Sequence, residues 1–273
     1  MTHGVSPTSL RPDRPAAPRV GRPPCVDVLG VPLALADYAA TTRWMDAMIE
    51  AGERGYVTAA AVHLVMVARE DPRTREAVLG ATLAVPDGQP LVWALRALGC
   101  PDASRVYGPD LMAHYCAHAA TRGTPMYLYG GRHQGALVQL ALRLRQRFPG
   151  IRIVGGYSPP FRALTPDEEE WVAQDINGSG AEVVWVGTGQ PKQEKWMAAM
   201  RERLDPPLLV GVGAAFDFHA GLVPQAPRWM QGLGLEWTYR LAHEPRRLWR
   251  RYARYNPRFV IGFARQYAQH RGL

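Results

Sequence analysis

Several short apolar runs in this sequence are each followed by polar side chains that can do chemistry. The run 82–85 ends in "PDGQP", where Asp87 and Gly88 form a Pro-Asp-Gly turn ahead of a helical pattern. An aspartate at this place either caps the helix that begins at Gln89 or presents its carboxylate as a general base or sugar ligand. The sequence alone leaves both alternatives open.

A glycine turn follows the run 126–129. The segment "GGRHQG" places Gly130 and Gly131 directly before the pattern of an amphipathic helix. Backbone N–H groups at such a turn, together with the helix dipole, can bind a phosphate. The segment is neither a Walker A loop nor a GxGxxG motif. Arg132 favours an anion site, whereas His133 by itself fits a polar helix start.

A second glycine turn, in "GTGQPKQEKW", follows the run 182–186. Its candidate binding residues are Gly187, Gly189, Pro191, Lys192, Gln193 and Glu194. The glycines permit a tight turn, the proline can open a helix, and an acidic first turn suits the helix dipole. The segment is therefore either a well-capped helix start or a source of an amide, a carboxylate and an ammonium group beside a ligand.

Two further segments carry charged candidates. "ASRVYGPDLM" places Arg105 five residues before Asp110, an aspartate that can also simply cap the next helix. Asp217 and His219 follow the run 208–212, but no third ligand stands at a suitable spacing. We therefore expect no metal and no cofactor. The sequence also contains no Ser-His-Asp order, nucleophile elbow or HExxH motif that would indicate another mechanism.

The elements that must position these residues alternate along the chain. The expected strands are 26–29, 55–59, 82–85, 126–129, 151–154, 182–186 and 208–212. The expected helices are 36–51, 62–69, 89–98, 109–122, 134–147, 167–177 and 192–203. Apolar strands separated by helices predict an α/β fold, a Rossmann-like, mostly parallel sheet with helices on both faces. Ligands of such sheets bind beyond the carboxyl ends of the strands, where the candidate residues lie.

Charge divides the 273 residues into three parts. Residues 1–24, rich in Pro and Arg, are expected to be a disordered lead. Residues 25–227 are the expected α/β core, with a net charge of −3. Residues 228–273 contain ten arginines against Glu236 and Glu244, a net charge of +8, and are the expected basic appendage. A charge so localised indicates an anionic partner.

The sequence also indicates a compartment. Three widely spaced cysteines form no CxxC pair, which favours reduced thiols. No apolar run approaches the roughly 20 residues that span a bilayer, and no signal peptide is recognised at the N-terminus. We expect a cytoplasmic protein that can lie on a membrane surface.

The segment 244–259, "EPRRLWRRYARYNPRF", has the pattern of a basic amphipathic helix. Pro245 can open it, and Pro257 is expected to kink or end it. The arginine face comprises Arg247, Arg250, Arg251, Arg254 and Arg258, and the apolar face Leu248, Trp249, Tyr252, Tyr255 and Phe259. Such a helix is typical of a membrane-surface element, but the same pattern fits an aromatic face packed on the core.

Taken together, the motifs resemble the WecG/TagA/CpsF family of bacterial glycosyltransferases (glycosyltransferase family 26). The matching segments include "AVPDGQPLVWALRALG", "SRVYGPDLM", "VVWVGTGQPKQEKWM" and "APRWMQGLGLEWTYRLAHEPRR", in family order over roughly 26–260. The resemblance implies inverting transfer of a sugar from a UDP-sugar to a polyprenyl-diphosphate-linked saccharide at the cytoplasmic face of the membrane, without a metal. The donors it implies are N-acetylmannosamine, N-acetylmannosaminuronate or glucose types, for teichoic acid or cell-surface polysaccharide.

The resemblance also assigns roles to residues. Asp87 matches the proposed general base, Thr58 and Gln193 match active-site residues, and Arg105 matches an arginine for the leaving diphosphate. The remaining binding candidates are Gly88, Asp110, Gly130, Gly131, Gly187, Gly189, Pro191, Lys192 and Glu194. For acceptor and membrane contact they are Arg240, Arg247, Arg250, Arg251 and Arg254. The family's usual Asn is replaced by Ala60, near His63, which leaves donor identity open.

Two other functions compete with this interpretation. A basic tail with interleaved aromatics also fits a nucleic-acid-binding α/β protein, although no nucleic-acid-binding motif supports that alternative. A nucleotide-sugar enzyme with a soluble acceptor is the other alternative. The sequence does not decide the oligomeric state, and a homo-oligomer is compatible with its exposed aromatics.

Overall fold

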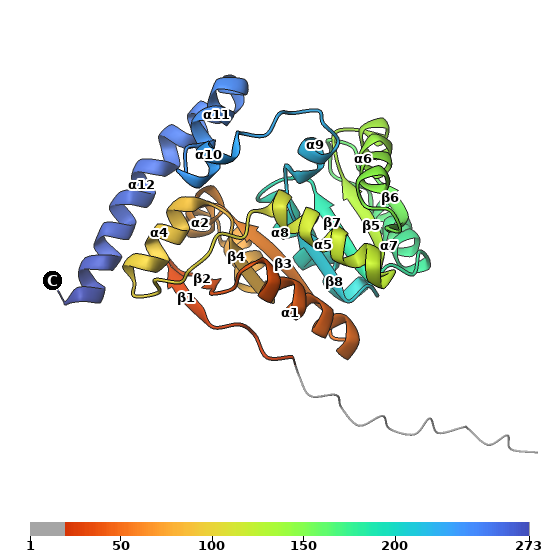
Figure 1. Ribbon diagram of the computed structural model, residues 1–273, viewed down its shortest axis with the longest axis horizontal. Coiled ribbons are helices and arrows are strands. Elements are labelled where there is room, and N and C mark those ends of the chain that lie inside the picture. Colours follow the sequence, from red (N-terminus) through yellow and green to blue (C-terminus); the bar gives the residue numbers. More distant parts are fainter. Residues whose placement is uncertain (1–19, 273) are drawn as a thin grey trace, which may run out of the picture.

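A six-stranded parallel sheet forms the centre of the computed structural model, which describes residues 20–272 (Figure 1). Most of the predicted lead, 1–19, lies outside the described residues. The strand order is β4-β3-β8-β7-β5-β6. The strands are β3 (Gly55–Ala60), β4 (Leu83–Pro86), β5 (Pro125–Gly130), β6 (Arg152–Tyr157), β7 (Val183–Gly187) and β8 (Leu208–Gly211). The predicted Rossmann-like α/β fold is confirmed.

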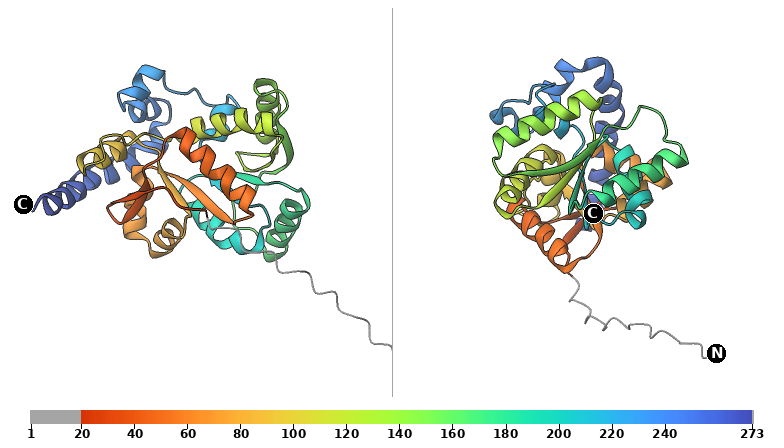
Figure 2. Two further views of the ribbon diagram at one scale, coloured as in Figure 1. Left: turned by 60° about the horizontal axis from the view of Figure 1, so that its bottom comes forward. Right: turned by 90° about the vertical axis from the view of Figure 1, so that its right-hand side faces the viewer.

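Helices cover both faces of the sheet (Figure 2). One face packs against α1 (Tyr38–Ala51), α5 (Gly108–Arg122) and α6 (Gln134–Arg147), and the other against α7 (Pro166–Gly178) and α8 (Lys192–Met200). Trp185 of β7 is fully buried in the first layer, edge-on to Tyr115 at 5.9 Å between ring centroids. Burial of these apolar faces drives the layered fold.

Local capping explains several helix boundaries. Asp37 begins α1 by accepting a hydrogen bond from the Ala40 N–H at 2.7 Å. Thr165 and Glu168 form a capping box at the start of α7. These side chains satisfy N–H groups that have no partner inside the helix. A third capped helix, α3 (Pro72–Leu79), was not predicted; Asp71 caps it. The helix predicted over 192–203 ends at Met200 and continues as a 3-10 turn.

The first predicted strand lies outside the main sheet. It is β1 (Cys25–Val28), which pairs antiparallel with β2 (Val31–Ala34), a strand that the sequence did not predict. The turn between them places Leu29 and Gly30 at φ of 55° and 88°. Two central residues with positive φ are typical of a tight hairpin, so the chain turns back before it can enter the parallel sheet.

The C-terminal helices lie beside the β4 edge of the sheet, outside α2 (Val62–Glu70) and α4 (Gln89–Ala97) (Figure 1). After α9 (Ala215–His219), the chain crosses to α10 (Arg228–Gly232), α11 (Glu236–His243) and α12 (Pro245–Arg271). Leu248 and Phe259 are 1% and 5% exposed, and Phe259 joins the apolar cluster formed by the hairpin, α2 and α4. The aromatic face of α12 therefore packs on the core in part, while Trp249 is 51% exposed.

Pro257 does not end this helix, as one sequence prediction had it, because α12 continues to Arg271. A proline removes one helical hydrogen bond, but tertiary contacts hold the helix on both sides of it. Beyond Pro257, the side-chain amide of Gln266 accepts from the Leu29 N–H at 2.9 Å and donates to the Asp27 carbonyl at 2.8 Å. Within residues 20–272, no helix is both long and apolar enough to cross a membrane.

Candidate active site

Several of the predicted site residues lie at or near the carboxyl ends of β3, β4, β7 and β8. Gly211 of β8 pairs with Thr58 of β3 on one side and with Val186 of β7 on the other. The loops that follow these strands are therefore neighbours in space, although they are distant in sequence. The carboxyl ends of the strands are the usual ligand site of an open α/β sheet.

Asp87 lies half-buried in the turn after β4 and does not cap α4. The N-cap of α4 is Gly88, without a side-chain bond. One Asp87 oxygen, Oδ1, accepts the Gly108 N–H at 2.8 Å. Its other oxygen accepts no hydrogen bond from any residue in the described part of the chain. Burial raises the pKa of Asp87 to about 6, against the opposing effect of the Arg105 guanidinium. A carboxylate of this pKa is ionised at neutral pH and can accept a proton.

Arg105 is held beside Asp87 by two contacts. Its Nε donates to the backbone carbonyl of Asp87, and its Nη2 forms an ion pair of 2.6 Å with Glu236 of α11. The guanidinium also lies over the Tyr107 ring, 4.2 Å from its centroid. Both charged side chains of the ion pair are largely buried, with 16% and 11% of their surfaces exposed. The arginine therefore presents a fixed positive charge at the Asp87 turn.

Glu236 was not among the sequence-predicted site residues. The signal for it was its place in the "GLEWTYR" segment, which the family resemblance already covered. Arg240, one turn later on α11, packs over the Phe218 ring at 5.8 Å. Burial raises the pKa of Asp87, and the positive charge of Arg240 opposes part of this rise. Helix α11 thus brings a carboxylate and a guanidinium to the candidate site.

Thr58 and Gln193 lie in a buried hydrogen-bond network at the ends of the strands. Both side chains, and that of Glu194, have 0% exposure. Glu194 Oε1 accepts from the Thr58 hydroxyl at 2.7 Å and from the Gln193 amide at 2.9 Å. Gln193 in turn accepts the Gly213 N–H at 3.0 Å. Burial raises the pKa of Glu194. In this structure the three side chains bind one another and fix the loops after β3, β7 and β8.

Close backbone packing explains two of the predicted glycines. A Cβ atom on Gly130 would lie 2.6 Å from the carbonyl carbon of Gly187, and one on Gly187 would lie 2.5 Å from the Phe216 ring. Gly131 has φ of +90° and donates its N–H to the Gly187 carbonyl at 3.3 Å. Gly189, at φ of +84°, meets no atom within 4 Å of its Cβ position and so faces open space. Of these glycines, Gly189 is the one whose Cβ direction leaves room for a ligand.

The remaining polar candidates have structural partners. Arg132 forms a two-point ion pair with Asp217, at 3.0 and 3.1 Å. His133 accepts the Ala136 N–H and caps α6, as the simpler interpretation predicted. Asp110 lies in the first turn of α5, where it accepts a 3.4 Å hydrogen bond from the Tyr38 hydroxyl.

Two predicted residues open α8. Pro191 occupies the N-cap position, and Lys192 begins the helix with an exposed side chain. The Gln190 amide before them donates to the Ala59 carbonyl at 2.6 Å. In the part of the chain that the structure describes, no three His, Cys, Asp or Glu side chains group together as a candidate metal site.

The arginine face of α12 is divided between two environments. Arg254 and Arg258 each form a 2.6 Å ion pair with Glu70 of α2. The charge of Arg251 partly opposes the rise that burial causes in the pKa of Glu194, and it adds to the lowering that burial causes in the pKa of His63. Arg250 is placed over the Trp249 ring at 5.5 Å. The side chain of Arg247 lies outside the described residues.

His63 stands at the start of α2, near the position where Ala60 replaces the usual family Asn. Its ring is edge-on to Tyr255 of α12 at 5.0 Å. Burial, followed by the Arg251 charge, lowers the pKa of His63 to about 3. The imidazole is therefore neutral at physiological pH, and it contributes to the packing of α12 on α2.

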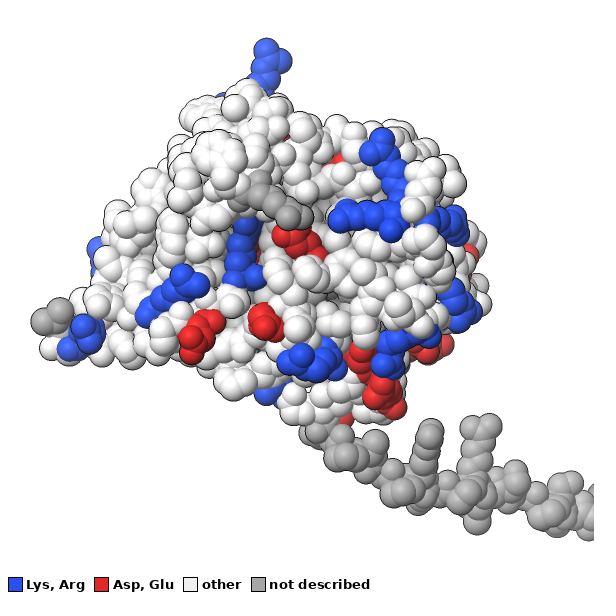
Figure 3. Space-filling view, in the orientation of Figure 1, with Lys and Arg blue, Asp and Glu red and all other residues white. Residues whose placement is uncertain are grey.

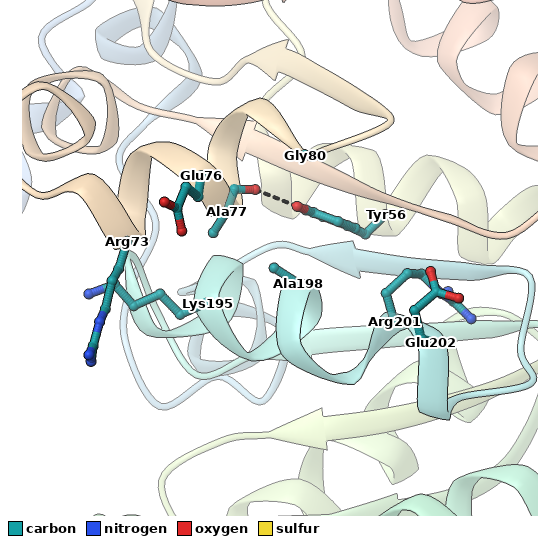
Figure 4. Close-up of a pocket in the computed structure, with 9 residues that line it drawn as sticks. All are labelled: Tyr56, Arg73, Glu76, Ala77, Gly80, Lys195, Ala198, Arg201 and Glu202. Atoms are coloured by element: carbon teal, nitrogen blue, oxygen red, sulfur yellow. Dashed lines mark hydrogen bonds between the residues drawn. The ribbon is translucent and has the colours of Figure 1, made fainter.

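A separate pocket of about 570 Å³ lies between α3 and α8 (Figure 4). It is lined by Tyr56 at the amino end of β3, by Lys195, and by Arg201, away from the Asp87 turn. Arg201 donates to the backbone carbonyls of four residues around the amino ends of the strands: Gly55, Leu204, Pro206 and Pro207. None of the predicted site residues lines this pocket, and Arg201 has a structural role there.

The fold and the Asp87 turn together define an α/β protein with a partly desolvated carboxylate and a fixed guanidinium at the strand ends. A model of the glycosyl transferase WecG/TagA/CpsF family matches residues 26–272. The chain belongs to this family. It is a glycosyltransferase of cell-surface polysaccharide synthesis.

Proposed function

We propose that the protein transfers a sugar from a UDP-sugar to a polyprenyl-diphosphate-linked saccharide, with inversion at the anomeric carbon. The observation that carries this proposal is the half-buried Asp87, whose pKa is raised to about 6 and whose Oδ2 accepts no hydrogen bond from the described residues. A general base needs such a pKa and a free oxygen directed to the substrate. The family membership supplies the reaction class.

In the proposed step, Asp87 takes the proton from the acceptor hydroxyl. The hydroxyl oxygen forms a bond to the anomeric carbon, the bond from that carbon to the UDP oxygen breaks, and UDP leaves with the electron pair. Arg105 neutralises part of the charge that develops on the diphosphate. Its ion pair with Glu236 and its contact with the Asp87 carbonyl hold it in place before the substrate binds, so little reorganisation is needed during reaction.

Thr58, Gln193 and Glu194 position the loops in this proposal. Their mutual hydrogen bonds hold the ends of β3, β7 and β8 together. Gly88, Gly189, Lys192 and the turn at Gly130 and Gly131 would line the nucleotide side. A Cβ atom added to Gly187 would lie 2.5 Å from the Phe216 ring, and one added to Gly130 would lie 2.6 Å from the Gly187 carbonyl carbon. These distances support close backbone packing there rather than direct phosphate contact by both residues.

The helices after residue 227 form the acceptor and membrane side in our proposal. Exposed apolar side chains are frequent here, with Trp229 at 63%, Trp237 at 41% and Trp249 at 51%. Arg250 lies beside Trp249, and such pairs of aromatic and basic residues suit a lipid headgroup region. Arg240, whose charge acts on Asp87, and Arg251, whose charge acts on Glu194, would contact the acceptor diphosphate. The protein would then act at the cytoplasmic face of the membrane.

A direct experiment tests the reaction. Purified protein would be incubated with a panel of UDP-sugars and other nucleotide sugars and with a short-chain diphosphate-linked saccharide lipid, and release of the nucleoside diphosphate would be measured. We expect one donor to give UDP release that depends on the acceptor. If no UDP-sugar gives acceptor-dependent release while another nucleotide sugar does, the donor part of the proposal is wrong. Release to a free saccharide at the same rate would refute the lipid-linked acceptor.

A further inference from the structure

A second pocket lies on the flank of the core, between α6 and the chain that follows α9. Its volume is about 520 Å³, and its polar lining comprises Arg143, Gln146, Arg147, His219 and Gln225 over an apolar floor. No carboxylate lines it. Figure 3 shows Lys and Arg side chains gathered on this side of the molecule, over α6. The pocket is separate from the Asp87 turn and uses none of the residues assigned to catalysis.

Within residues 20–272, the two arginines of this pocket have no carboxylate or carbonyl partner. Neither Arg143 nor Arg147 forms an ion pair or donates a hydrogen bond there, although Arg147 lies over the Phe148 ring at 5.1 Å. Spaced four residues apart, they project from the same face of α6. Gln146 and Gln225 also make no side-chain hydrogen bond among the described residues. Two guanidinium groups and two amides therefore line one pocket, and their N–H groups donate to no acceptor among the described residues.

Helix electrostatics alone do not explain this arrangement. Arginines near the carboxyl end of a helix stabilise its dipole. Arg145 and Arg147 both lie in the last turn of α6, and Arg145 also donates to the Ile153 carbonyl at 3.0 Å. Arg143, by contrast, packs tightly against the turn after α9. A Cβ atom on Gly221 would lie 2.1 Å from its Nη1, and Gly221 has φ of +68°. The turn thus leaves room for this guanidinium at the pocket.

The nearby acidic groups are occupied elsewhere. Asp217 is paired with Arg132, and Asp110 accepts from the Tyr38 hydroxyl. His219 forms a hydrogen bond of 2.8 Å through Nε2 with the Pro109 carbonyl. Burial lowers the pKa of His219, so its imidazole is neutral at pH 7. The pocket therefore carries two positive charges that no group of the described chain neutralises.

We propose that this pocket binds a phosphate or diphosphate group. Guanidinium groups bind phosphate oxygens through paired, charge-assisted hydrogen bonds, and the two amides supply further donors. The Phe218 ring of the floor also packs against Arg240, at 5.8 Å, so the bound group would lie one side chain away from the acceptor side of the active site. The source of the phosphate can be a soluble molecule or a lipid headgroup.

Binding of inorganic pyrophosphate tests the proposal. Isothermal titration calorimetry would compare the full-length protein with Arg143→Gln, Arg147→Gln and the control Arg145→Gln. The control removes one positive charge from the same helix turn but outside the pocket. We expect the two pocket variants to weaken one binding event about tenfold each, and the control to stay within about twofold. Circular dichroism would verify that all variants are folded.

A vesicle assay distinguishes the two sources. The same variants would be sedimented with phosphatidylcholine vesicles with and without phosphatidic acid. Loss of pyrophosphate binding in the pocket variants supports a soluble ligand. Loss of phosphatidic-acid-dependent sedimentation in them, without a pyrophosphate effect, supports a lipid headgroup. If all three variants behave alike in both assays, the site does not exist. UDP release is not a readout here, so this outcome is independent of the proposed reaction.

Discussion

Substitution of Asp87 by Asn should have opposite effects on stability and on activity, and both effects follow from the burial of this side chain. Asn keeps the oxygen that accepts the Gly108 N–H but removes the charge. The pKa of Asp87 rises from an ordinary value of 3.8 to about 6. At 1.36 kcal/mol per pKa unit, the folded state carries an ionised Asp87 at a cost of at most about 3 kcal/mol. Asp87→Asn should therefore stabilise the protein at pH 7.5 while it abolishes sugar transfer.

The sign of the pH dependence follows from the raised pKa. Between pH 3.8 and about 6 the folded protein holds a proton on Asp87 that the unfolded chain has lost. The free energy of unfolding of the wild type therefore falls as the pH rises through this window, whereas the variant lacks this contribution. The free energy of unfolding of the variant should exceed that of the wild type by the full amount above pH 6, and this excess should shrink toward pH 4.

Thermal unfolding by circular dichroism measures this difference. At roughly 2 °C per kcal/mol for a chain of this size, the variant should melt up to about 6 °C higher at pH 7.5 and at nearly the same temperature at pH 4. Asp102→Asn is the control, because Asp102 also follows β4 in the sequence but its side chain is exposed. A melting temperature for Asp87→Asn at or below that of the wild type at pH 7.5 would refute the desolvated carboxylate. In the transfer assay, wild-type kcat/KM should fall about tenfold per pH unit below pH 6.

Three further predictions address the Arg105 ion pair, the buried Thr58 network and the proposed membrane surface. Glu236→Gln should lower kcat/KM for transfer, and a double-mutant cycle with Arg105→Gln should give a coupling energy of about 1–3 kcal/mol in urea unfolding, because the 2.6 Å ion pair is largely buried. Thr58→Val should cost about 1–3 kcal/mol in the same assay, since it leaves a buried oxygen of Glu194 without its 2.7 Å donor. Trp249→Ser should reduce sedimentation with anionic vesicles several-fold, because this half-exposed indole lies on the proposed membrane side.

Each of these substitutions has a matched comparison. Thr58→Ser keeps the hydroxyl and should recover most of the lost stability; equal loss in both variants would mean that packing, rather than the hydrogen bond, matters. Trp171→Ser removes an equally exposed indole, 51% in each case, from α7. If it reduces vesicle binding as much as Trp249→Ser does, the membrane surface is not at α12. A coupling energy near zero for Glu236 and Arg105 would show that the ion pair does not hold the arginine.

Local patterns in the sequence were enough to predict the sheet and most of its helices. Buried strands of a parallel sheet are continuously apolar, and turns and caps depend on neighbouring residues, so both are visible without the fold. The hairpin was the main exception. The sequence showed an apolar run at 26–29, but whether that run joined the sheet depended on the backbone angles of Leu29 and Gly30.

The sequence named candidate residues for the site, and the structure shows which of them are neighbours in space. The rule that ligands bind at strand ends brought Asp87 and the PKQE segment to one rim. Whether Asp87 capped a helix or stood half-buried beside Arg105 was undecided by the sequence, because a Pro-Asp-Gly turn serves both. Glu236 was missed as a site residue because an ion pair across 131 positions has no local signature.

By itself, the sequence determined the fold class, the family segments and the uneven distribution of charge, because these depend on composition and short-range spacing. Only the tertiary structure decided what each charge does. It paired Arg254 and Arg258 with Glu70 and joined Thr58 to Glu194 by a hydrogen bond. Within the described chain, it left Arg143 and Arg147 without an ion pair or a hydrogen bond. Desolvation and pairing depend on which groups meet after folding, and those distances are set by packing rather than by position along the chain.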